Sequence, residues 1–129
     1  MLVPIDEAAW PLVKVRWDSA VTDSMVDTFL ARMNEWLERG ERFALLLDSR
    51  GAKGMSPEQR NRLIGHMKQN AARTQKCLVQ AIVLDNLIQR TLFYGINVIF
   101  PNPFPSKVFG DPVEAEAWLR SELGAAPPT

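Results

Sequence analysis

The chain has 129 residues, 47% of them hydrophobic, and its 15 basic residues balance its 15 acidic ones. This length predicts one domain with a substantial core. The balanced charge excludes a long-range field that would draw the whole molecule to nucleic acid or to an anionic membrane. The single cysteine excludes an internal disulfide, and the single histidine leaves no Cys/His cluster for zinc. We therefore expect no metal, no cofactor and a reducing, cytoplasmic setting.

Neither a leader nor a membrane span is expected from the sequence. The N-terminal residues, MLVPIDEAAW, lack a basic start followed by an apolar core, which argues against a signal peptide. The longest apolar stretch, Leu92 to Phe104, is interrupted by glycine, asparagine and proline residues. It is too short to cross a bilayer, so we expect no transmembrane segment.

Two extended segments, Leu2 to Ile5 and Pro11 to Trp17, open the chain and predict a hairpin. Apolar and basic residues alternate in the second segment, which predicts a strand near a sheet edge with one buried and one wetted face. The residues of the buried face would be Val13, Val15 and Trp17, and those of the wetted face Lys14 and Arg16.

An amphipathic helix is predicted next. Thr22 or Asp23 can cap its start, and Gly40 lies where a C-terminal glycine belongs. Trp36 lies off the apolar stripe of this helix, so we expect its side chain to be partly exposed. The stripe follows helical spacing at Val26, Phe29, Leu30, Met33 and Leu37.

The central stretch, Phe43 to Pro57, combines a strand, a loop and a helix start. Its apolar beginning predicts a strand buried on both faces, and a polar, glycine-punctuated loop starts at Asp48. Ser56 and Gln59 form a capping-box pattern for a helix that is expected to reach about Ala72. Open α/β sheets place their sites in loops of this kind, so we expect the functional site here.

The second half of the chain predicts two strands and two helices. Cys77 to Leu84 predict a buried strand, and Leu87 to about Val98 predict a helix whose end could equally begin an extended segment. Lys107 to Phe109 predict a short strand, and residues 124–129 a disordered tail. Asp111 caps the last helix, which we expect to start at Pro112 and to pack through Val113, Ala117, Trp118 and Leu119.

The order of these elements predicts a single α/β domain over residues 1–123. We expect a mixed, mostly parallel sheet of about five strands, flanked by four helices and joined by right-handed crossovers. The opening hairpin is the antiparallel part of this sheet.

Several stretches together carry a family resemblance that covers about Leu12 to Leu119. They are the hairpin and first helix, the strand FALLLDSR, the serine at the next helix start, and the closing FGDPVEAEAWL. In this combination the chain resembles the SpoIIAA-like branch of the STAS fold. The resemblance implies a non-enzymatic protein-binding module in bacterial regulation or signalling, and related families include lipid-carrying folds.

Ser56 is the candidate phosphorylation site. In the phosphorylated antagonists that the chain resembles, a serine begins the helix after the central strand, and Ser56 matches that position. Met55 and Pro57 beside it depart from the aspartate and the small residue common in those antagonists. The alternative is an ordinary helix cap. The helix macrodipole would favour a phosphate there, which could also meet Arg50 or Lys53.

Residues 50–76 contain seven Lys and Arg residues against Glu58 alone. This bias predicts a surface for an acidic protein, a phosphorylated ligand or lipid head groups. The alternative is a solvated helix face balanced by acids such as Glu35, Glu38 and Glu41. Asp48 is expected to hydrogen-bond loop amides. The alternative is ligand or metal binding, and Asp85, at the end of the next strand, is the second acid that a catalytic pair would need. We expect a protein partner to contact Asp48, Ser49, Arg50, Lys53, Arg60 and Arg62.

Aromatic residues gather near the proline-rich turn, at Phe93, Tyr94, Phe100 and Phe104. Core packing is one interpretation of this cluster. The alternatives are a homodimer interface, a groove for a partner, or a pocket for a lipid or other small apolar ligand.

No Ser-His-Asp, Cys-His or glycine-rich phosphate motif occurs in the sequence, so we expect no enzyme and no catalytic residue. His66 is expected to be a solvated helix residue and Cys77 an inert core thiol. Nucleic acid is not an expected partner, because no aromatic residues interleave with the basic ones to stack bases. The leading hypothesis is a cytoplasmic protein-binding module. The alternative is a carrier or sensor of a small apolar ligand.

Overall fold

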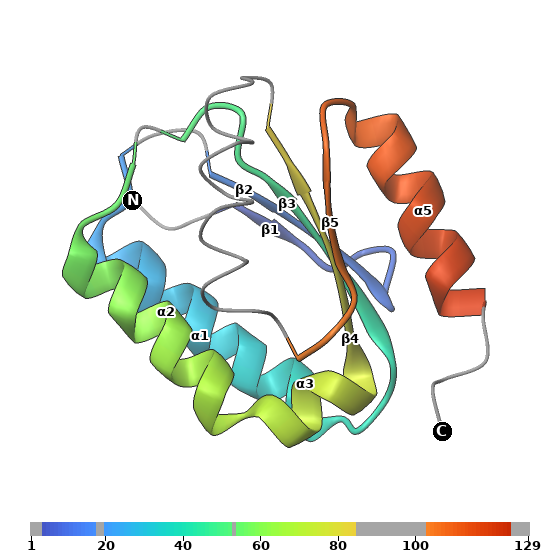
Figure 1. Cartoon of the computed structure of the whole chain (residues 1–129), viewed down its shortest axis with the longest axis horizontal. Coiled ribbons are helices and arrows are strands. Elements are labelled where there is room, and N and C mark those ends of the chain that lie inside the picture. The colour runs from blue at the N-terminus through green and yellow to red at the C-terminus, as the bar shows by residue number, and fades with distance from the viewer. Residues whose placement is uncertain (1–3, 18–19, 53, 85–102, 125–129) are drawn as a thin grey trace.

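A five-stranded sheet lies at the centre of the molecule, with helices on both of its faces (Figure 1). The computed structural model describes residues 4–17, 20–52, 54–84 and 103–124. The strands stand side by side in chain order, with β1 antiparallel to β2 and all later neighbours parallel. They are β1 (Ile5–Asp6), β2 (Leu12–Arg16), β3 (Phe43–Asp48), β4 (Leu78–Val83) and β5 (Ser106–Phe109). The predicted α/β class with a mixed, mostly parallel sheet is confirmed.

The helices divide unequally between the two faces of the sheet. Within the described ranges, α1 (Asp23–Glu38), α2 (Pro57–Gln69) and α3 (Ala71–Cys77) lie on one face, and α5 (Pro112–Gly124) lies on the other (Figure 1). The predicted helix over residues 87–98 lies outside the described residues.

Alternate residues of β3 build the two cores. Phe43 and Leu45 point toward α1 and α3, whereas Ala44 and Leu46 pack with residues of α5. This alternation follows from the period of two along a strand. The strand is buried on both faces, as its apolar run predicted.

The opening hairpin is also confirmed. Ile5 pairs with Val15 and Asp6 with Lys14 in antiparallel register. Val15 is buried, while Lys14 is half-buried and Arg16 is exposed. The alternation of apolar and basic residues therefore gives β2 the expected buried and wetted faces.

Local signals place the ends of α1 correctly. The hydroxyl of Thr22 accepts a hydrogen bond from the backbone N–H of Met25 at 3.1 Å, which is the predicted N-cap. Gly40, with a φ of +69°, follows the end of the helix in a conformation that side chains rarely adopt.

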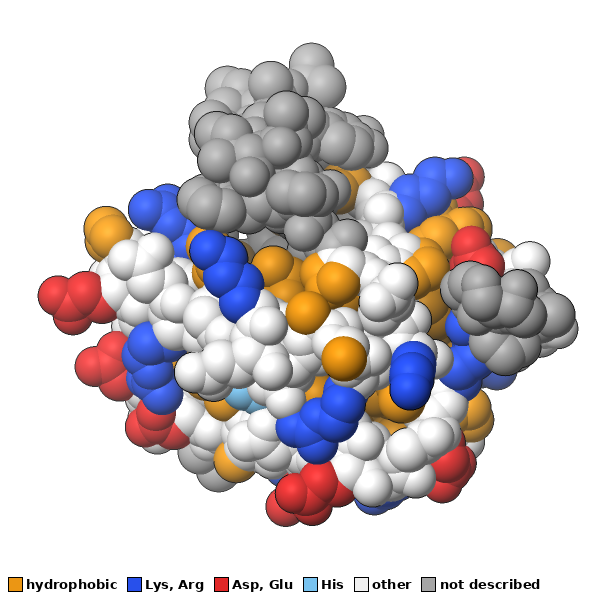
Figure 2. All heavy atoms as spheres, turned by 60° about the horizontal axis from the view of Figure 1, so that its bottom comes forward, with side chains coloured by type: hydrophobic (Ala, Val, Ile, Leu, Met, Phe, Trp, Pro, Cys, Tyr) orange, Lys and Arg blue, Asp and Glu red, His pale blue; other side chains and the backbone are white. Residues whose placement is uncertain are grey.

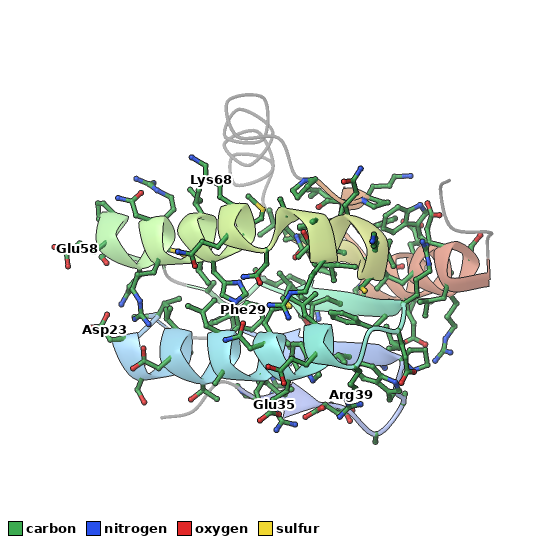
Figure 3. All side chains as sticks on the ribbon, turned by 90° about the horizontal axis from the view of Figure 1, so that it is seen from below. Asp23, Phe29, Glu35, Arg39, Glu58 and Lys68 are labelled. Atoms are coloured by element: carbon green, nitrogen blue, oxygen red, sulfur yellow. The ribbon has the colours of Figure 1, made fainter. Side chains whose placement is uncertain are left out.

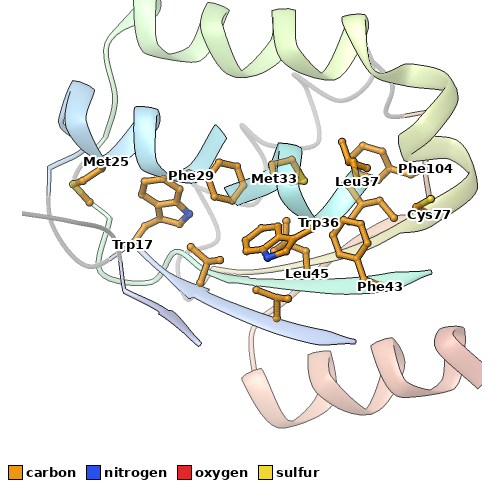
Figure 4. Close-up of a cluster of buried hydrophobic side chains, with 13 residues drawn as sticks. Trp17, Met25, Phe29, Met33, Trp36, Leu37, Phe43, Leu45, Cys77 and Phe104 are labelled. Carbon is orange, nitrogen blue, oxygen red and sulfur yellow. The ribbon is translucent and has the colours of Figure 1, made fainter. Parts of the chain in front are cut away.

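The expectation that Trp36 is partly exposed is wrong, because its side chain is fully buried. Its ring packs against Phe29 and Phe43 in the core beneath α1 (Figure 4). Its indole N–H donates to the carboxylate of Glu7 at 2.8 Å. The hairpin loop thus covers a position that the periodicity of the helix alone leaves outside.

The helix predicted to reach about Ala72 ends instead at Gln69, and a second helix, α3, follows. Asn70 interrupts the helical run, and its side-chain amide donates to the carbonyl of His66 at 2.9 Å. An asparagine side chain can hydrogen-bond nearby backbone groups in this way. These bonds compete with the backbone hydrogen bonds of the helix and favour its end. Cys77 is buried as predicted, but it ends α3 instead of beginning β4.

The inward face of α5 differs from the prediction. Leu119 is buried as expected and Trp118 is half-buried, but Val113 is 74% exposed and Ala117 is also exposed. Ala115 and Leu119 form the buried side instead. Residues two positions apart lie on nearly opposite sides of a helix, so packing through Ala115 turns both wrongly placed residues outward. The helix also includes Gly124, which was predicted to begin the tail.

Candidate functional site

The loop between β3 and α2 lies at the carboxyl edge of the sheet. α1 and α2 run side by side with their amino ends at this edge, as the labels of Asp23 and Glu58 indicate (Figure 3). Backbone hydrogen bonds hold the loop: Ser49 donates to Val83 at 3.0 Å, and Val21 donates to Gly54 at 3.2 Å. The loop is therefore tied to β4 and to the segment before α1.

Ser56 forms the predicted capping box and is exposed to solvent. Its hydroxyl accepts from the backbone N–H of Gln59 at 3.0 Å, and its own N–H donates to the side chain of Gln59 at 2.9 Å. The cap interpretation is confirmed by this geometry. Phosphorylation of Ser56 stays a prediction.

Gln59 has a second role that the sequence did not reveal. Its side chain is buried, and its amide nitrogen donates to the carbonyl of Val21 at 3.1 Å and to the carboxylate of Asp23 at 3.0 Å. It thereby joins the amino ends of α1 and α2. The capping pattern identified Gln59, but its partners at the start of α1 and just before it are 36 and 38 residues away and leave no local signal.

Asp48 lies at the end of β3, on the face of the sheet that α5 covers. Its carboxylate accepts from the side chain of Arg50 at 2.9 and 2.7 Å and from the backbone N–H of Arg50 at 3.3 Å. The expected bond to a loop amide is present, but the guanidinium is the main partner. The Arg50 side-chain hydrogen bond lowers the pKa of Asp48, against the opposing effect of burial, and Arg16 adds to the lowering.

The basic residues of α2 are partly paired with α1. Arg62 forms an ion pair with Asp27, and the ring of His66 hydrogen-bonds Asn34 at 2.7 Å. Both pairs cross between the two helices. Arg60 is exposed and has no ion pair within the described part of the chain. Burial and the charge of Arg73 lower the pKa of His66.

Two of the three acids expected to balance this basic region have other partners. Glu35 pairs with Arg32, and Glu41 accepts a hydrogen bond from the indole of Trp10. Lys and Arg side chains are spread over the α2 side of the molecule, while Asp and Glu lie mostly toward its margins (Figure 2). Lys53, one of the predicted contact residues, lies outside the described residues.

The predicted aromatic cluster is described only at Phe104. This side chain is buried and belongs to the core beneath α1 and α3 (Figure 4). Phe93, Tyr94 and Phe100 lie outside the described residues, as does Asp85. The homodimer interface and the apolar ligand pocket therefore stay predictions.

A groove that the sequence did not predict opens on the α5 face. Its volume is about 450 Å³, and it is lined by β1, β2, the end of β3 and the start of α5. Lys14 from β2 and Glu116 from α5 form an ion pair across it at 2.7 Å. Asp48 and Leu46 also line it, so the residue singled out at the end of β3 faces this groove. Strand alternation predicted the wetted side of β2, but the position of α5 could not be derived locally.

The described residues contain neither a metal-binding cluster nor a membrane-spanning helix. Among these residues, no group of three or more His, Cys, Asp or Glu side chains is placed to hold a metal ion. None of the helices described has the length and apolar character needed to span a membrane.

No family model and no curated protein matches the chain. Two solved structures are similar to it in fold. One is an uncharacterized protein of the DUF3478 family with a SpoIIAA-like fold from Shewanella loihica PV-4, with a TM-score of 0.70, 15% identity and 91% of each chain covered. The other is an anti-sigma factor antagonist from Mycobacterium paratuberculosis, with a TM-score of 0.56, 9% identity and 92% of each chain covered.

These likenesses define the class of fold. The chain has a SpoIIAA-like α/β fold, and the resemblance found in the sequence is confirmed at the level of the fold. At such low identities, the likeness carries no information about individual site residues.

Proposed function

We propose that this chain is a non-enzymatic, cytoplasmic protein-binding module in bacterial regulation. The SpoIIAA-like fold supports the proposal, because one of the similar structures is an anti-sigma factor antagonist. Its name describes a protein that acts on another protein. A fold alone does not assign a function, and a particular surface of this molecule gives the proposal its content.

That surface is the exposed start of α2, which we call the α2 patch: Met55, Ser56 and Arg60. Met55 is a large apolar side chain that is 43% exposed, and Ser56 and Arg60 are also exposed. Ser56 and Arg60 are four residues apart and therefore share one face of the helix. The observation that carries the proposal is the exposure of Met55 just before α2, together with an exposed Arg60 in the first turns of α2 that has no ion pair among the described residues.

The patch has the chemistry of a protein contact. Methionine adapts its shape to an apolar partner surface, and arginine is enriched in interfaces, where it binds carboxylates. Gln59 fixes the patch by joining the amino ends of the two helices. We therefore expect a partner with an acidic residue beside a small apolar contact. Arg62 contributes less, because Asp27 already neutralises it.

Phosphorylation of Ser56 would change the net charge of the α2 patch from positive to negative. A phosphate carries about −1.5 to −2 charges and is stabilised at a helix amino end. It would lie one turn from Arg60 and compete with an acidic partner for that side chain. We propose that modification of Ser56 weakens partner binding without unfolding the protein.

A pull-down from native lysate tests the patch. Wild type and Arg60→Glu are compared at low and moderate salt, with Lys76→Glu as the matched control because Lys76 is an exposed lysine on α3. We expect Arg60→Glu to reduce recovery of a salt-sensitive partner by about tenfold and the control to leave it unchanged. Equal recovery by all three proteins would move the site away from α2.

The charge at Ser56 is tested by comparing Ser56→Asn with Ser56→Asp. Both residues are good helix caps, so the pair isolates the added charge from loss of the cap. We expect only the aspartate variant to lose the partner. If the two variants bind equally, a phosphate switch at this position is excluded.

Oligomeric state and bound ligands are tested separately. Native mass spectrometry of protein purified without detergent distinguishes a monomer from the proposed homodimer. An added small-molecule mass would instead favour the carrier hypothesis that the aromatic residues near position 100 suggested.

A further inference from the structure

Polar contacts hold α2 to α1, which runs beside it in the same direction (Figure 3). Three side chains of α2, spaced three and four residues apart, share the face that meets α1. We call their contacts the α1–α2 seam. The contacts are Gln59 with Asp23, Arg62 with Asp27, and His66 with Asn34.

Apolar packing adds little to this seam. The structure describes every residue of α2, and Gln59 is the only one that is buried, whereas α1 buries six apolar side chains. Leu63 and Met67 pack against the core beneath α1, but both stay partly exposed. The contacts of Arg62 and His66 are exposed to solvent, so water can replace them at little cost. The helix α2 is therefore attached more weakly than α1.

The backbone departs from helical geometry on both sides of α2. Gly54, two residues before the N-cap, has a φ of +107°, which residues with side chains rarely adopt. Its carbonyl accepts from the N–H of Val21 at 3.2 Å, which anchors the chain at that point. Asn70 follows α2 with a φ of −109° and a ψ of 19° and separates it from α3. Such positions at the ends of elements are where hinges absorb changes in φ and ψ.

His66 makes the seam sensitive to protons. Burial lowers its pKa, and the charge of Arg73 on α3 adds to the lowering. The group that meets its ring from α1 is the uncharged Asn34, and the ion pair of Arg62 with Asp27 lies one turn away. If α2 leaves α1, the ring is solvated and its pKa returns toward the ordinary value of about 6.5. The detached form then binds a proton more readily, so detachment becomes easier as the pH falls through that value.

We propose that α2 is a hinged helix, which detaches from α1 as one unit between Gly54 and Asn70, and that proton binding to His66 favours the detached form. The whole α2 patch lies between these hinges and moves with the helix. The opening is a property of the free protein and is measured without a partner. Failure of the opening and failure of the proposed partner binding are therefore separate outcomes.

Amide hydrogen exchange of the full chain, followed by NMR, tests the opening. A detached helix of 13 residues is marginal in water, so it would lose its backbone hydrogen bonds and exchange. We expect the amides of α2 beyond its first turn to have similar protection factors, about 100-fold below those of α1 at pH 7. Equal protection of the two helices would overturn the proposal, because α2 would then open only with the whole molecule.

The role of the proton is tested on His66, the only histidine of the chain. NMR titration of its ring should give a lower pKa in the folded protein than in the urea-unfolded chain. Between pH 7.5 and pH 5.5, the protection factors of α2, corrected for the intrinsic exchange rate, should fall about fivefold. His66→Gln keeps a hydrogen-bond donor for Asn34 but does not titrate, so this fall should disappear. No fall in wild type, or the same fall in His66→Gln, would overturn the role of the proton.

Arg62→Gln and Arg60→Gln form a matched pair of variants on α2. Arg62 pairs with Asp27, whereas Arg60 has no ion pair among the residues that the structure describes. Arg62→Gln should lower the protection of α2 by about twofold to fivefold, because an exposed ion pair is lost. Arg60→Gln should leave it unchanged. Equal protection in the two variants would show that the seam does not hold the helix.

Leu46→Val separates local opening from global unfolding. Leu46 is buried on the α5 face and stays buried when α2 detaches. The substitution should lower the protection of α1 by about fivefold, because α1 exchanges only when the molecule unfolds. The protection of α2 should not change. An equal fall in both helices would mean that they open together, which would overturn the proposal.

Discussion

The two faces of the sheet are built differently. On the α1 side, aromatic rings follow one another through the core: Trp17 meets Phe29 at 5.5 Å, Phe29 meets Trp36 at 6.4 Å, and Trp36 meets Phe43 at 6.1 Å between ring centroids. On the α5 side, the buried residues are aliphatic, and a single described helix covers them. The first face is large and closed, while the second is thin and leaves a charged groove.

The face beneath α1 therefore contributes most to the stability of the fold, whereas the α5 face has room for charged residues. Aromatic side chains bury the largest areas, so most of the free energy gained by burying apolar surface comes from the core beneath α1. The α5 face can keep charged residues beside its core because apolar burial on this face contributes less to the stability of the fold. Glu7, in the hairpin loop, also holds the first face together, because it accepts from the indole of Trp36 and pairs with Arg32 of α1.

The largest expected effect is on the aromatic face. Phe43→Ala removes a fully buried ring that contacts Trp36 and stacks on Trp10 at 5.5 Å. We expect a loss of about 3 to 5 kcal/mol in the free energy of unfolding, measured by urea denaturation. A loss smaller than that of the matching substitution on the α5 face would contradict the comparison.

That matching substitution is Leu46→Ala, three residues along the same strand on the opposite face. The cavity it creates would open into the groove and could fill with water. We expect a loss of about 2 to 3 kcal/mol, toward the low end for buried leucine. Urea denaturation of both variants side by side gives the ranking, and the unchanged slope of the transition serves as the check that both unfold in the same way.

A smaller effect is expected where polar contacts hold the helix layer. Gln59→Ala removes the bonds that join the amino ends of α1 and α2 and leaves the carbonyl of Val21 without that partner. We expect a loss of about 1 to 2 kcal/mol. Gln75→Ala, at an exposed position of α3, is the control and should lie within about 0.5 kcal/mol of wild type. Equal values for the two variants would show that the side-chain hydrogen bonds of Gln59 add nothing to stability.

The smallest effect is a pH dependence at the groove. Because Arg50 holds the pKa of Asp48 below its ordinary value, the unfolded state binds a proton more readily than the folded state. The stabilisation is therefore present above about pH 4 and is lost as the pH falls below that value. Arg50 is largely solvated, so the contribution should be below about 1 kcal/mol.

Asp48→Asn is the variant that measures this contribution. Unfolding free energies of wild type and variant are compared between pH 6 and pH 2.5. Wild type should lose more stability than the variant over this range. Parallel curves would mean that the pair with Arg50 adds nothing to folding.

The candidate site was predictable in part. The capping pattern found Ser56 and Gln59, and the end of the apolar run found Asp48, because each signal lies within a few residues. The pairing of Arg62 with Asp27 was not predictable, since these residues are 35 positions apart and belong to different helices. The groove was missed for the same reason, because it is formed by strands and a helix from distant parts of the chain.

The sequence by itself determined the order of the strands, the caps at Thr22 and Ser56, the positive φ at Gly40 and the two-sided burial of β3. Each of these depends on local chain geometry or on a short apolar pattern. Only the tertiary structure decided that Trp36 is buried and that α5 packs through Ala115, and both follow from contacts with neighbours that lie far away in the sequence. Local rules fix where a helix starts and ends, but the surface packed against it fixes which of its sides is inside.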